Sequence, residues 1–311
     1  MKTDSIANTQ PNRQSIGHSK SQATWWALGA IALWATLASL GVALRNVPPF
    51  LLTGIALVAG STLALPVVWR DRSVWRIAPT TLLLGVYGLF GFHFLLFLAL
   101  RIAPPVEANL VNYMWPLFMV VLAPLLLKGV QLRAVHVLAA VLGFAGAAVA
   151  IVGASGGGTG TAGGSGSASF GDWSWGYLLA LGSAFIWASY SLWTQRVAAF
   201  STAAVGLFGL VSGALSLGCH VLLEASVSLS GQDYLLLLAM GLGPLGAAFF
   251  MWDKALKLGD ARQIGILSYI TPLASTALLM LVSGRAFTWS IALAAAMIIA
   301  AALMGTRAKN Q

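Results

Sequence analysis

The sequence predicts an all-α polytopic membrane protein, with ten transmembrane helices that form two inverted five-helix repeats around a central cavity. The first observation is composition: the 311 residues are 59% hydrophobic and 8% charged, and the mean hydropathy is +0.86. A soluble domain is about a quarter charged, so this chain has too few charged residues to cover a folded surface in water. The second observation is that long apolar runs recur to the end of the chain, and the third is a motif found once in each half.

Ten apolar runs are long enough to cross the hydrocarbon core of a bilayer, which is about 30 Å thick and takes roughly 20 helical residues. Charged residues, Pro or Gly bound each run, as expected where a helix leaves the lipid. In chain order the runs cover residues 24–44, 50–69, 79–100, 105–127, 134–154, 175–195, 202–223, 233–252, 261–282 and 287–305.

The remaining segments are polar or rich in Gly and Ser. Residues 1–22 lack apolar periodicity and are predicted to be a disordered cytoplasmic tail, with residues 307–311 as a short tail at the other end. Residues 155–172 have the Gly and Ser content of a flexible linker. This linker separates a first repeat, residues 23–154, from a second repeat, residues 173–306.

The distribution of positive charge predicts the topology, because cytoplasmic loops retain Lys and Arg. With the N-terminus inside, fourteen of the 17 Lys and Arg residues fall on the inner side, and Arg45, Arg101 and Arg285 fall on the outer side. An odd number of spans would remove this bias. We therefore expect a multi-pass protein of the bacterial inner membrane, with both termini cytoplasmic.

The same counts exclude several other classes of protein. The net charge of +9 suggests nucleic-acid binding, but the positive residues lie between apolar runs and form no continuous patch. One cysteine, Cys219, permits no internal disulfide and indicates no thiol or metal chemistry. No cofactor, metal or nucleic-acid partner is expected. We expect a monomer in the lipid bilayer that acts on a small-molecule solute.

A short motif indicates an internal duplication. Residues 98–117 align with residues 254–273 at a constant offset of 156, with five of the twenty positions identical. The identities include Tyr-x-x-Pro-Leu, which begins at Tyr113 and at Tyr269. Chance similarity between Leu-rich and Ala-rich segments is the alternative.

The duplication predicts a transporter. Trp34-Ala35 resembles Trp187-Ala188 at an offset of 153, near the start of each half. Because five spans is an odd number, the second copy enters the membrane inverted. Inverted repeats are typical of carriers in which one half moves against the other around a site at the membrane midplane.

The chain resembles the drug/metabolite transporter superfamily in its five-plus-five arrangement and in the Ala-Leu-(Arg/Lys) and Tyr-x-x-Pro-Leu signature of each half. Within it, His93 and the run Asn112-Tyr113-Met114-Trp115-Pro116 are similar to the YddG-type amino acid exporters. The resemblance covers residues 24 to about 307. It implies a basket of ten helices with a central cavity, and export of aromatic and other neutral amino acids.

Three tryptophans are candidates for substrate binding. Tryptophan prefers the lipid–water interface, where its N–H finds water. Most of the twelve lie near span ends, and Trp252 is counted among these, but Trp34, Trp115 and Trp187 fall at the middle of spans. An indole N–H at this depth needs a polar or hydrated interior. The alternative is a packed protein core.

Polar residues near the same depth are the next candidates. His93 is the one ionisable side chain clearly in the middle of a predicted span, although a neutral histidine can also tie two helices together. Pro116 and Pro272 each free the carbonyl four residues earlier, which belongs to Asn112 in the first case. We expect Asn112, Tyr113 and His93 to bind the amino and carboxyl ends of the solute. Helix bending for packing alone is the rival explanation.

Tyr190 and Tyr269 add hydroxyl groups at interior depth in the second half, where each can also serve packing. No Asp or Glu falls in the central part of any predicted span, which disfavours proton coupling through a carboxylate. The sequence therefore predicts facilitative export of small neutral amino acids by alternating access. Export of another small metabolite or drug, with proton coupling, is the alternative.

Two further classes fit poorly. Gly153-Ala154-Ser155-Gly156 resembles the serine motif of rhomboid proteases, but Ser155 stands where a span gives way to the linker, without a helix start to supply an oxyanion hole. We do not expect an enzyme. A channel is disfavoured because no ring of carbonyls or charges is evident.

Overall fold

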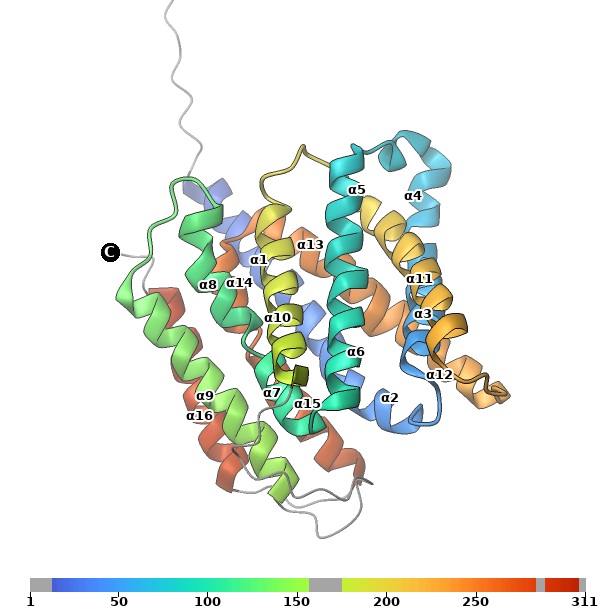
Figure 1. Ribbon diagram of the computed structural model, residues 1–311. Helices are drawn as coiled ribbons and strands as arrows, with labels where there is room; N and C mark the ends of the chain where they lie inside the picture. Colours follow the sequence, from blue (N-terminus) through green and yellow to red (C-terminus); the bar gives the residue numbers. More distant parts are fainter. Residues whose placement is uncertain (1–12, 157–174, 284–288, 308–311) are drawn as a thin grey trace, which may run out of the picture.

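The computed structural model describes residues 13–156, 175–283 and 289–307, and every regular element within these ranges is helical (Figure 1). The predicted linker from residue 157 onward and the tails 1–12 and 308–311 lie outside the described residues. Helix α1 begins at Arg13, so residues 13–22 of the predicted tail belong to a helix.

The first repeat contains α1 (Arg13–Ala35), α2 (Leu37–Ala43), α3 (Pro49–Ser61), η1 (Thr62–Ala64), α4 (Leu65–Arg70), η2 (Arg72–Trp75), α5 (Pro79–Val86), η3 (Tyr87–Gly91), α6 (Phe92–Ile102), α7 (Pro105–Asn112), α8 (Trp115–Leu126) and α9 (Ala134–Gly156). The second contains α10 (Trp175–Trp193), α11 (Ala204–Leu223), α12 (Gly231–Leu242), η4 (Gly243–Ala247), α13 (Ala248–Leu258), α14 (Ala261–Leu267), α15 (Ile270–Ser283) and α16 (Trp289–Arg307).

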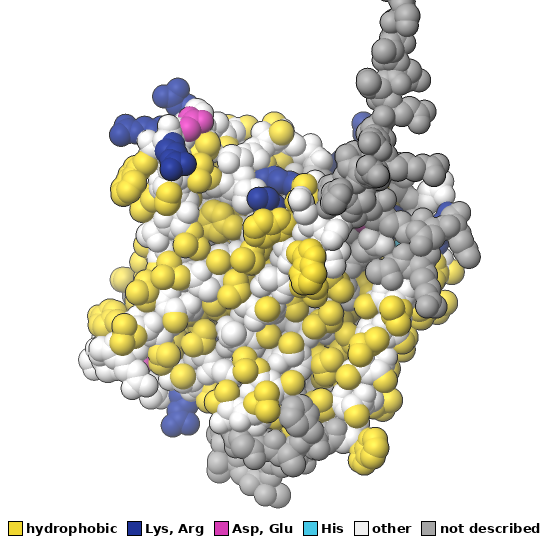
Figure 2. Space-filling view, turned by 180° about the vertical axis from the view of Figure 1, so that it is seen from behind, with side chains coloured by type: hydrophobic (Ala, Val, Ile, Leu, Met, Phe, Trp, Pro, Cys, Tyr) yellow, Lys and Arg dark blue, Asp and Glu magenta, His cyan; other side chains and the backbone are white. Residues whose placement is uncertain are grey.

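Eight helical stretches of the described residues are long and apolar enough to cross a membrane. Helices α10 and α16 occupy the positions of the other two predicted runs. Figure 2 shows that the side of the molecule is mostly hydrophobic, whereas Lys and Arg gather mainly at its upper edge. This is the surface of a multi-pass membrane protein, because an apolar belt faces lipid and the charges lie beyond it.

The two repeats share local irregularities as well as sequence. The π-helical turns Tyr87–Gly91 and Gly243–Ala247 are separated by the offset of 156 that aligns the motif. The helices that follow, α6 and α13, begin and end at the same offset. A shared π-helical turn is a rare feature, so it supports duplication more strongly than shared apolar residues do.

The two spans that carry the Tyr-x-x-Pro-Leu motif are interrupted just before its proline, Pro116 or Pro272. Helix α7 ends at Asn112 and α8 begins at Trp115, while α14 ends at Leu267 and α15 begins at Ile270. A proline in a continuous helix would clash with the carbonyl four residues earlier, and the break removes this clash. In the second repeat the Ser268 carbonyl accepts the N–H of Thr271 at 2.9 Å, and Ser268 is fully buried and is not a cavity-lining residue.

Helices of the two repeats pack against one another throughout the molecule. Helix α3 packs on α11, α1 on α13, α9 on α16, and α10 on α6 and α8 (Figure 1). Glycines permit the closest approach: a Cβ atom on Gly60 would lie 2.6 Å from the carbonyl oxygen of Gly241. Small residues of this kind are typical of helix contacts in membranes.

Candidate functional site

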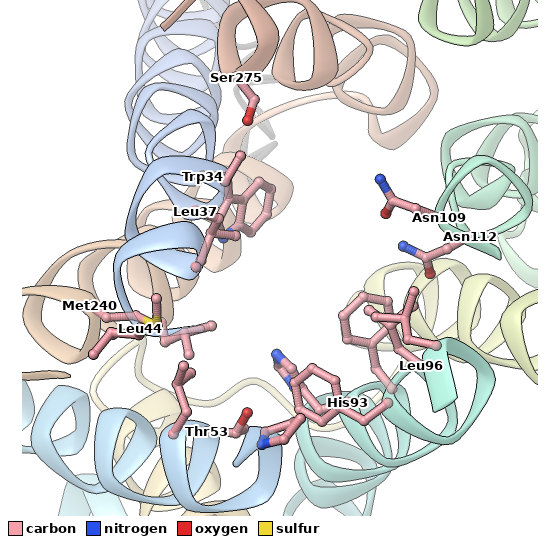
Figure 3. Close-up of a pocket in the computed structure, with 18 of the residues that line it drawn as sticks. Trp34, Leu37, Leu44, Thr53, His93, Leu96, Asn109, Asn112, Met240 and Ser275 are labelled. Atoms are coloured by element: carbon pink, nitrogen blue, oxygen red, sulfur yellow. The ribbon is translucent and has the colours of Figure 1, made fainter. Parts of the chain in front are cut away.

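A cavity of about 550 Å³ lies between the repeats. The first repeat supplies most of its wall, from α1, α2, α3, α6, α7 and the residues around Trp115. The second repeat supplies six lining residues, which are Trp187, Met240, Leu245, Phe249, Thr271 and Ser275. Figure 3 shows Trp34, His93 and Asn112 around one open space, each coming from a different helix. This volume suits a small molecule of amino acid size.

A cluster of tryptophans forms one end of the cavity. Trp34 and Trp187 meet with ring centroids 5.9 Å apart, and Trp115 lies 6.4 Å from Trp187. Trp252 contacts all three, at 5.1 Å from Trp34, 5.5 Å from Trp115 and 6.3 Å from Trp187. The three midspan tryptophans predicted from the sequence therefore come together.

The expectation that Trp252 lies near a span end, at the interface, was wrong. The helical stretch Gly231–Leu258 continues beyond the predicted end of its span at residue 252, and Trp252 is 1% exposed. A helical spacing provided a usable signal, because Trp252 follows Phe249 by three residues and so shares its helix face. Phe249 is the residue equivalent to His93 at the offset of 156.

The four tryptophans of this cluster differ in whether the indole N–H has a hydrogen-bond acceptor. Trp34 donates to the carbonyl of Pro244 at 3.1 Å, and Trp252 donates to Ser191 Oγ at 3.1 Å. For Trp115 and Trp187, which line the cavity, the described residues provide no acceptor. A buried N–H costs free energy when it lacks a partner, so these two groups are available to a solute or to water.

His93 and Asn112 each use one polar atom within the protein. The Nδ1 atom of His93 lies 2.6 Å from the carbonyl of Leu89, in the π-helical turn, so it carries the proton and leaves Nε2 as an acceptor. Asn112 Oδ1 accepts the Ser183 hydroxyl at 2.8 Å, which leaves the amide nitrogen. Figure 3 shows the amides of Asn109 and Asn112 directed toward the cavity.

The remaining predicted residues divide into two groups. Tyr113 lines the cavity, but Tyr190 and Tyr269 do not. Tyr190 packs with its ring centroid 5.4 Å from that of Trp187, and Tyr269 is fully buried. Pro116 and Pro272 are buried beside the helix breaks and are not among the lining residues.

The charge of the lining is positive or neutral. Arg45 is the one lining residue, among those described, with a permanent charge, and none of them is Asp or Glu. A carboxylate is nevertheless buried elsewhere: Asp253 is 3% exposed and accepts Thr202 Oγ1 at 2.7 Å and Lys257 Nζ at 2.6 Å. The sequence placed Asp253 in an inner segment outside the spans, because it ended that helix at residue 252.

Duplicated helical repeats that enclose an aromatic cavity within an apolar belt define this protein as a membrane transporter. The sequence matches the EamA-like transporter family over residues 22–152 and 174–306. The chain belongs to this family, which confirms the resemblance to the drug/metabolite transporters and the duplication.

Similar proteins extend over nearly the whole chain. It is 40% identical to an aromatic amino acid exporter YddG of Ancylobacter novellus, over 93% of this chain and 98% of that protein. It is 25% identical to the protein of the same name from Escherichia coli, over 92% and 97% of the two chains. A crystal structure of a protein with 37% sequence identity superposes with a TM-score of 0.82, covering 94% of this chain and all of the other.

Proposed function

We propose that this protein exports small neutral amino acids, aromatic and bulky apolar ones first, from the cytoplasm by alternating access. The observation that carries the proposal is a cavity of about 550 Å³ lined by aromatic rings, with polar groups and without a carboxylate. Relatives similar over nearly their full length are named aromatic amino acid exporters, which supports the same class of solute.

The apolar part of the solute is expected to lie against the tryptophan cluster. Trp34, Trp115 and Trp187 offer ring faces and edges, and aromatic pairs contribute about 0.5–1.5 kcal/mol beyond the area they bury. The same faces attract an ammonium group. Amino acids with aliphatic side chains are expected to be exported as well as aromatic ones, because a ring face also packs against aliphatic groups.

The hydrogen-bonding atoms left free in the cavity fix the orientation of the solute. His93 Nε2 accepts, so it suits the ammonium group of an amino acid, and the Asn112 amide nitrogen donates, so it suits the carboxylate. The N–H groups of Trp115 and Trp187 are further donors. A zwitterion satisfies both kinds of atom, whereas an amine or an acid alone satisfies one.

The proposed topology has ten transmembrane helices, two inverted repeats and cytoplasmic termini in the bacterial inner membrane, with the protein acting as a monomer. The concentration of Lys and Arg at one edge supports this orientation. Arg45, predicted to be outside, lines the cavity together with its neighbours Leu44 and Val47. The structure is thus proposed to be open to the outer side.

The proposed export is facilitative, without proton coupling, because none of the described residues that line the cavity has a carboxylate. Proton-coupled export of another metabolite or drug is the second candidate, and the buried carboxylate of Asp253 is the observation that favours it. Proton relays in transporters use buried acidic residues of this kind.

Counterflow in proteoliposomes tests the proposal. Vesicles preloaded with phenylalanine should exchange labelled phenylalanine, tryptophan and methionine, with saturation and without a pH gradient. Phenethylamine, which lacks the carboxylate, and phenyllactate, which lacks the ammonium group, should exchange less. Absence of exchange for every amino acid would overturn the proposed solute class, and strict dependence on a pH gradient would select the second candidate.

A further inference from the structure

The cavity extends from the interior of the spans to a turn that joins two of them. Trp34, His93 and Asn112, which surround its open space in Figure 3, lie within spans. Arg45 and Val47 also line the cavity, and they belong to the turn 44–48 between α2 and α3. Under the proposed topology this turn is on the outer side, so an exported solute passes Arg45 as it leaves.

The backbone on both sides of Arg45 is fixed. Leu44 and Val47 are buried, whereas Arg45 between them is exposed. The Leu44 N–H donates to the Leu40 carbonyl at 2.9 Å, and the Val47 N–H donates to the Leu44 carbonyl at 2.9 Å. The turn therefore holds the guanidinium at the cavity wall while leaving it in contact with water.

The charge of Arg45 is not neutralised by the described part of the chain. The ion pairs found there do not include Arg45. Arg101, which is also predicted to be on the outer side, is instead paired with Glu224 at 2.8 Å. Of the other acidic residues predicted on that side, Asp233 caps α12 and Glu107 lies in the first turn of α7. Because a guanidinium stays protonated at physiological pH, Arg45 keeps a full positive charge.

The rest of the lining does not discriminate against cations. The ring faces of Trp34, Trp115 and Trp187 attract ammonium groups, and His93 Nε2 is an acceptor. A side chain such as that of lysine would therefore be accepted by the aromatic part of the cavity. Among the described lining residues, Arg45 is the one whose permanent charge opposes it.

We propose that Arg45 selects solutes by charge, a role that rests on the proposed export of amino acids through this cavity. It disfavours amino acids with a positively charged side chain and favours a negatively charged side chain over a positive one. Two unit charges about 10 Å apart, at an effective dielectric constant of about 20, interact strongly enough to change affinity by about tenfold. Apolar walls such as those of this cavity concentrate the field of a charge.

This role differs from that of the groups proposed to bind the solute. His93 and Asn112 are proposed to contact the amino and carboxyl groups that all amino acids share, so they do not distinguish one side chain from another. Arg45 acts on the net charge of the solute without a fixed contact. Removal of its charge should therefore change which amino acids compete, while the affinity for a neutral one stays the same.

Three amino acids of equal chain length test the proposal by competition against labelled phenylalanine in counterflow. Norleucine is neutral at the end of its side chain, lysine is positive and α-aminoadipate is negative. Arg45→Gln should strengthen competition by lysine about tenfold and weaken competition by α-aminoadipate about tenfold, with norleucine unchanged. Arg45→Glu should enlarge both shifts. Arg72→Gln is the matched control, because this exposed arginine does not line the cavity.

Chemical modification of one variant separates charge from packing. In a Cys219→Ser background, Arg45→Cys can be treated with aminoethyl, methyl or sulfonatoethyl methanethiosulfonate, which add a positive, a neutral or a negative group. The positive adduct should restore the discrimination against lysine, the neutral adduct should behave like Arg45→Gln, and the negative adduct should favour lysine. Raised salt should reduce the difference between the charged adducts, since exposed charges are screened.

The outcomes distinguish this proposal from the proposed function. An unchanged ranking of the three amino acids in Arg45→Gln and in all three adducts would overturn the role of Arg45 and leave amino acid export intact. An equal loss of competition by all three would also overturn it, because it would indicate a structural role. Absence of phenylalanine exchange by the unmodified protein would overturn the proposed function instead.

Discussion

Trp34 and Trp187, which hold equivalent positions in the two repeats, meet with their rings at 76° and their centroids 5.9 Å apart. The repeats thus touch through the residues that also line the cavity. The ring centroid of Phe249 lies 6.1 Å from that of Trp34 and 5.5 Å from that of Trp187, and the Phe249 and His93 rings meet edge to face with centroids 6.2 Å apart. One continuous aromatic surface therefore joins the repeat contact to the proposed ammonium acceptor.

Loss of a cavity tryptophan should impair transport without unfolding the protein. Trp115→Ala is expected to lower the counterflow of phenylalanine by about tenfold or more, because a ring that lines the cavity is removed. Trp289→Ala is the matched control, since that side chain is 90% exposed. Gel filtration in detergent checks folding. Equal activity of the two variants would contradict the site assignment.

Two substitutions should distinguish the residue that binds the carboxylate of the solute from the residue that binds its ammonium group. Asn112→Leu removes the amide donor, so it should weaken exchange of phenylalanine and phenyllactate but spare phenethylamine. His93→Leu removes the acceptor, so it should weaken exchange of phenylalanine and phenethylamine but spare phenyllactate. Each lost hydrogen bond to a charged group is expected to cost about 1.5–3 kcal/mol, or roughly tenfold to a hundredfold in affinity. Competition by unlabelled analogues measures this, and the same analogue ranking in both variants would contradict the assigned orientation.

Much of the fold and part of the site could be predicted from the sequence. Apolar runs of helical length specify spans because lipid offers the backbone no hydrogen-bond partner. Trp34, Trp115 and Trp187 could be singled out because an indole N–H at midspan requires a polar interior. His93 and Asn112 followed from the cost of burying polar groups.

The rest of the site could not be predicted, because equivalent positions of the two repeats differ in whether they line the cavity. Tyr113 and Tyr269 occupy the same position in the motif, so no sequence rule distinguishes the one that lines the cavity from the one that is buried. The sequence put Trp252 and Asp253 at the end of a span, although both are buried within a longer helix, and the reason is simpler. Charged residues were taken to end the span, whereas the Lys257 ion pair allows Asp253 to be buried within the helix.

A close helix contact should be sensitive to a single methyl group. Gly88 lies against Tyr190, and a Cβ atom placed on it would be 2.3 Å from Cγ of the tyrosine ring. Gly88→Ala should therefore destabilise the protein by about 1–3 kcal/mol, because neither helix can move without loss of packing. Gly218→Ala is the control, since nothing lies within 4 Å of its added Cβ. The temperature of half-maximal aggregation in detergent compares them, and an equal shift would contradict the contact.

Glu224 should hold the start of α3 to the end of α11. Its side chain is 1% exposed, and its carboxylate accepts the backbone N–H groups of Phe50 at 3.0 Å and Leu51 at 3.2 Å. Arg101 donates to the same carboxylate at 2.8 Å, and His220 Nδ1 lies 3.0 Å from it. Two carboxylate oxygens thus serve two orphan donors of a helix N-terminus and two basic side chains, as a buried carboxylate requires.

Glu224→Gln keeps the size of this side chain but replaces one acceptor oxygen by a donor and removes the charge. The substitution should lower the free energy of unfolding by about 2–4 kcal/mol, since at least one partner is left buried and unpaired. Glu107→Gln, in the first turn of α7, removes a helix-dipole interaction of less than about 1 kcal/mol and serves as the control. Thermal unfolding in detergent measures the difference. A Glu224→Gln protein as stable as the Glu107→Gln protein would show that the carboxylate does not fasten α3.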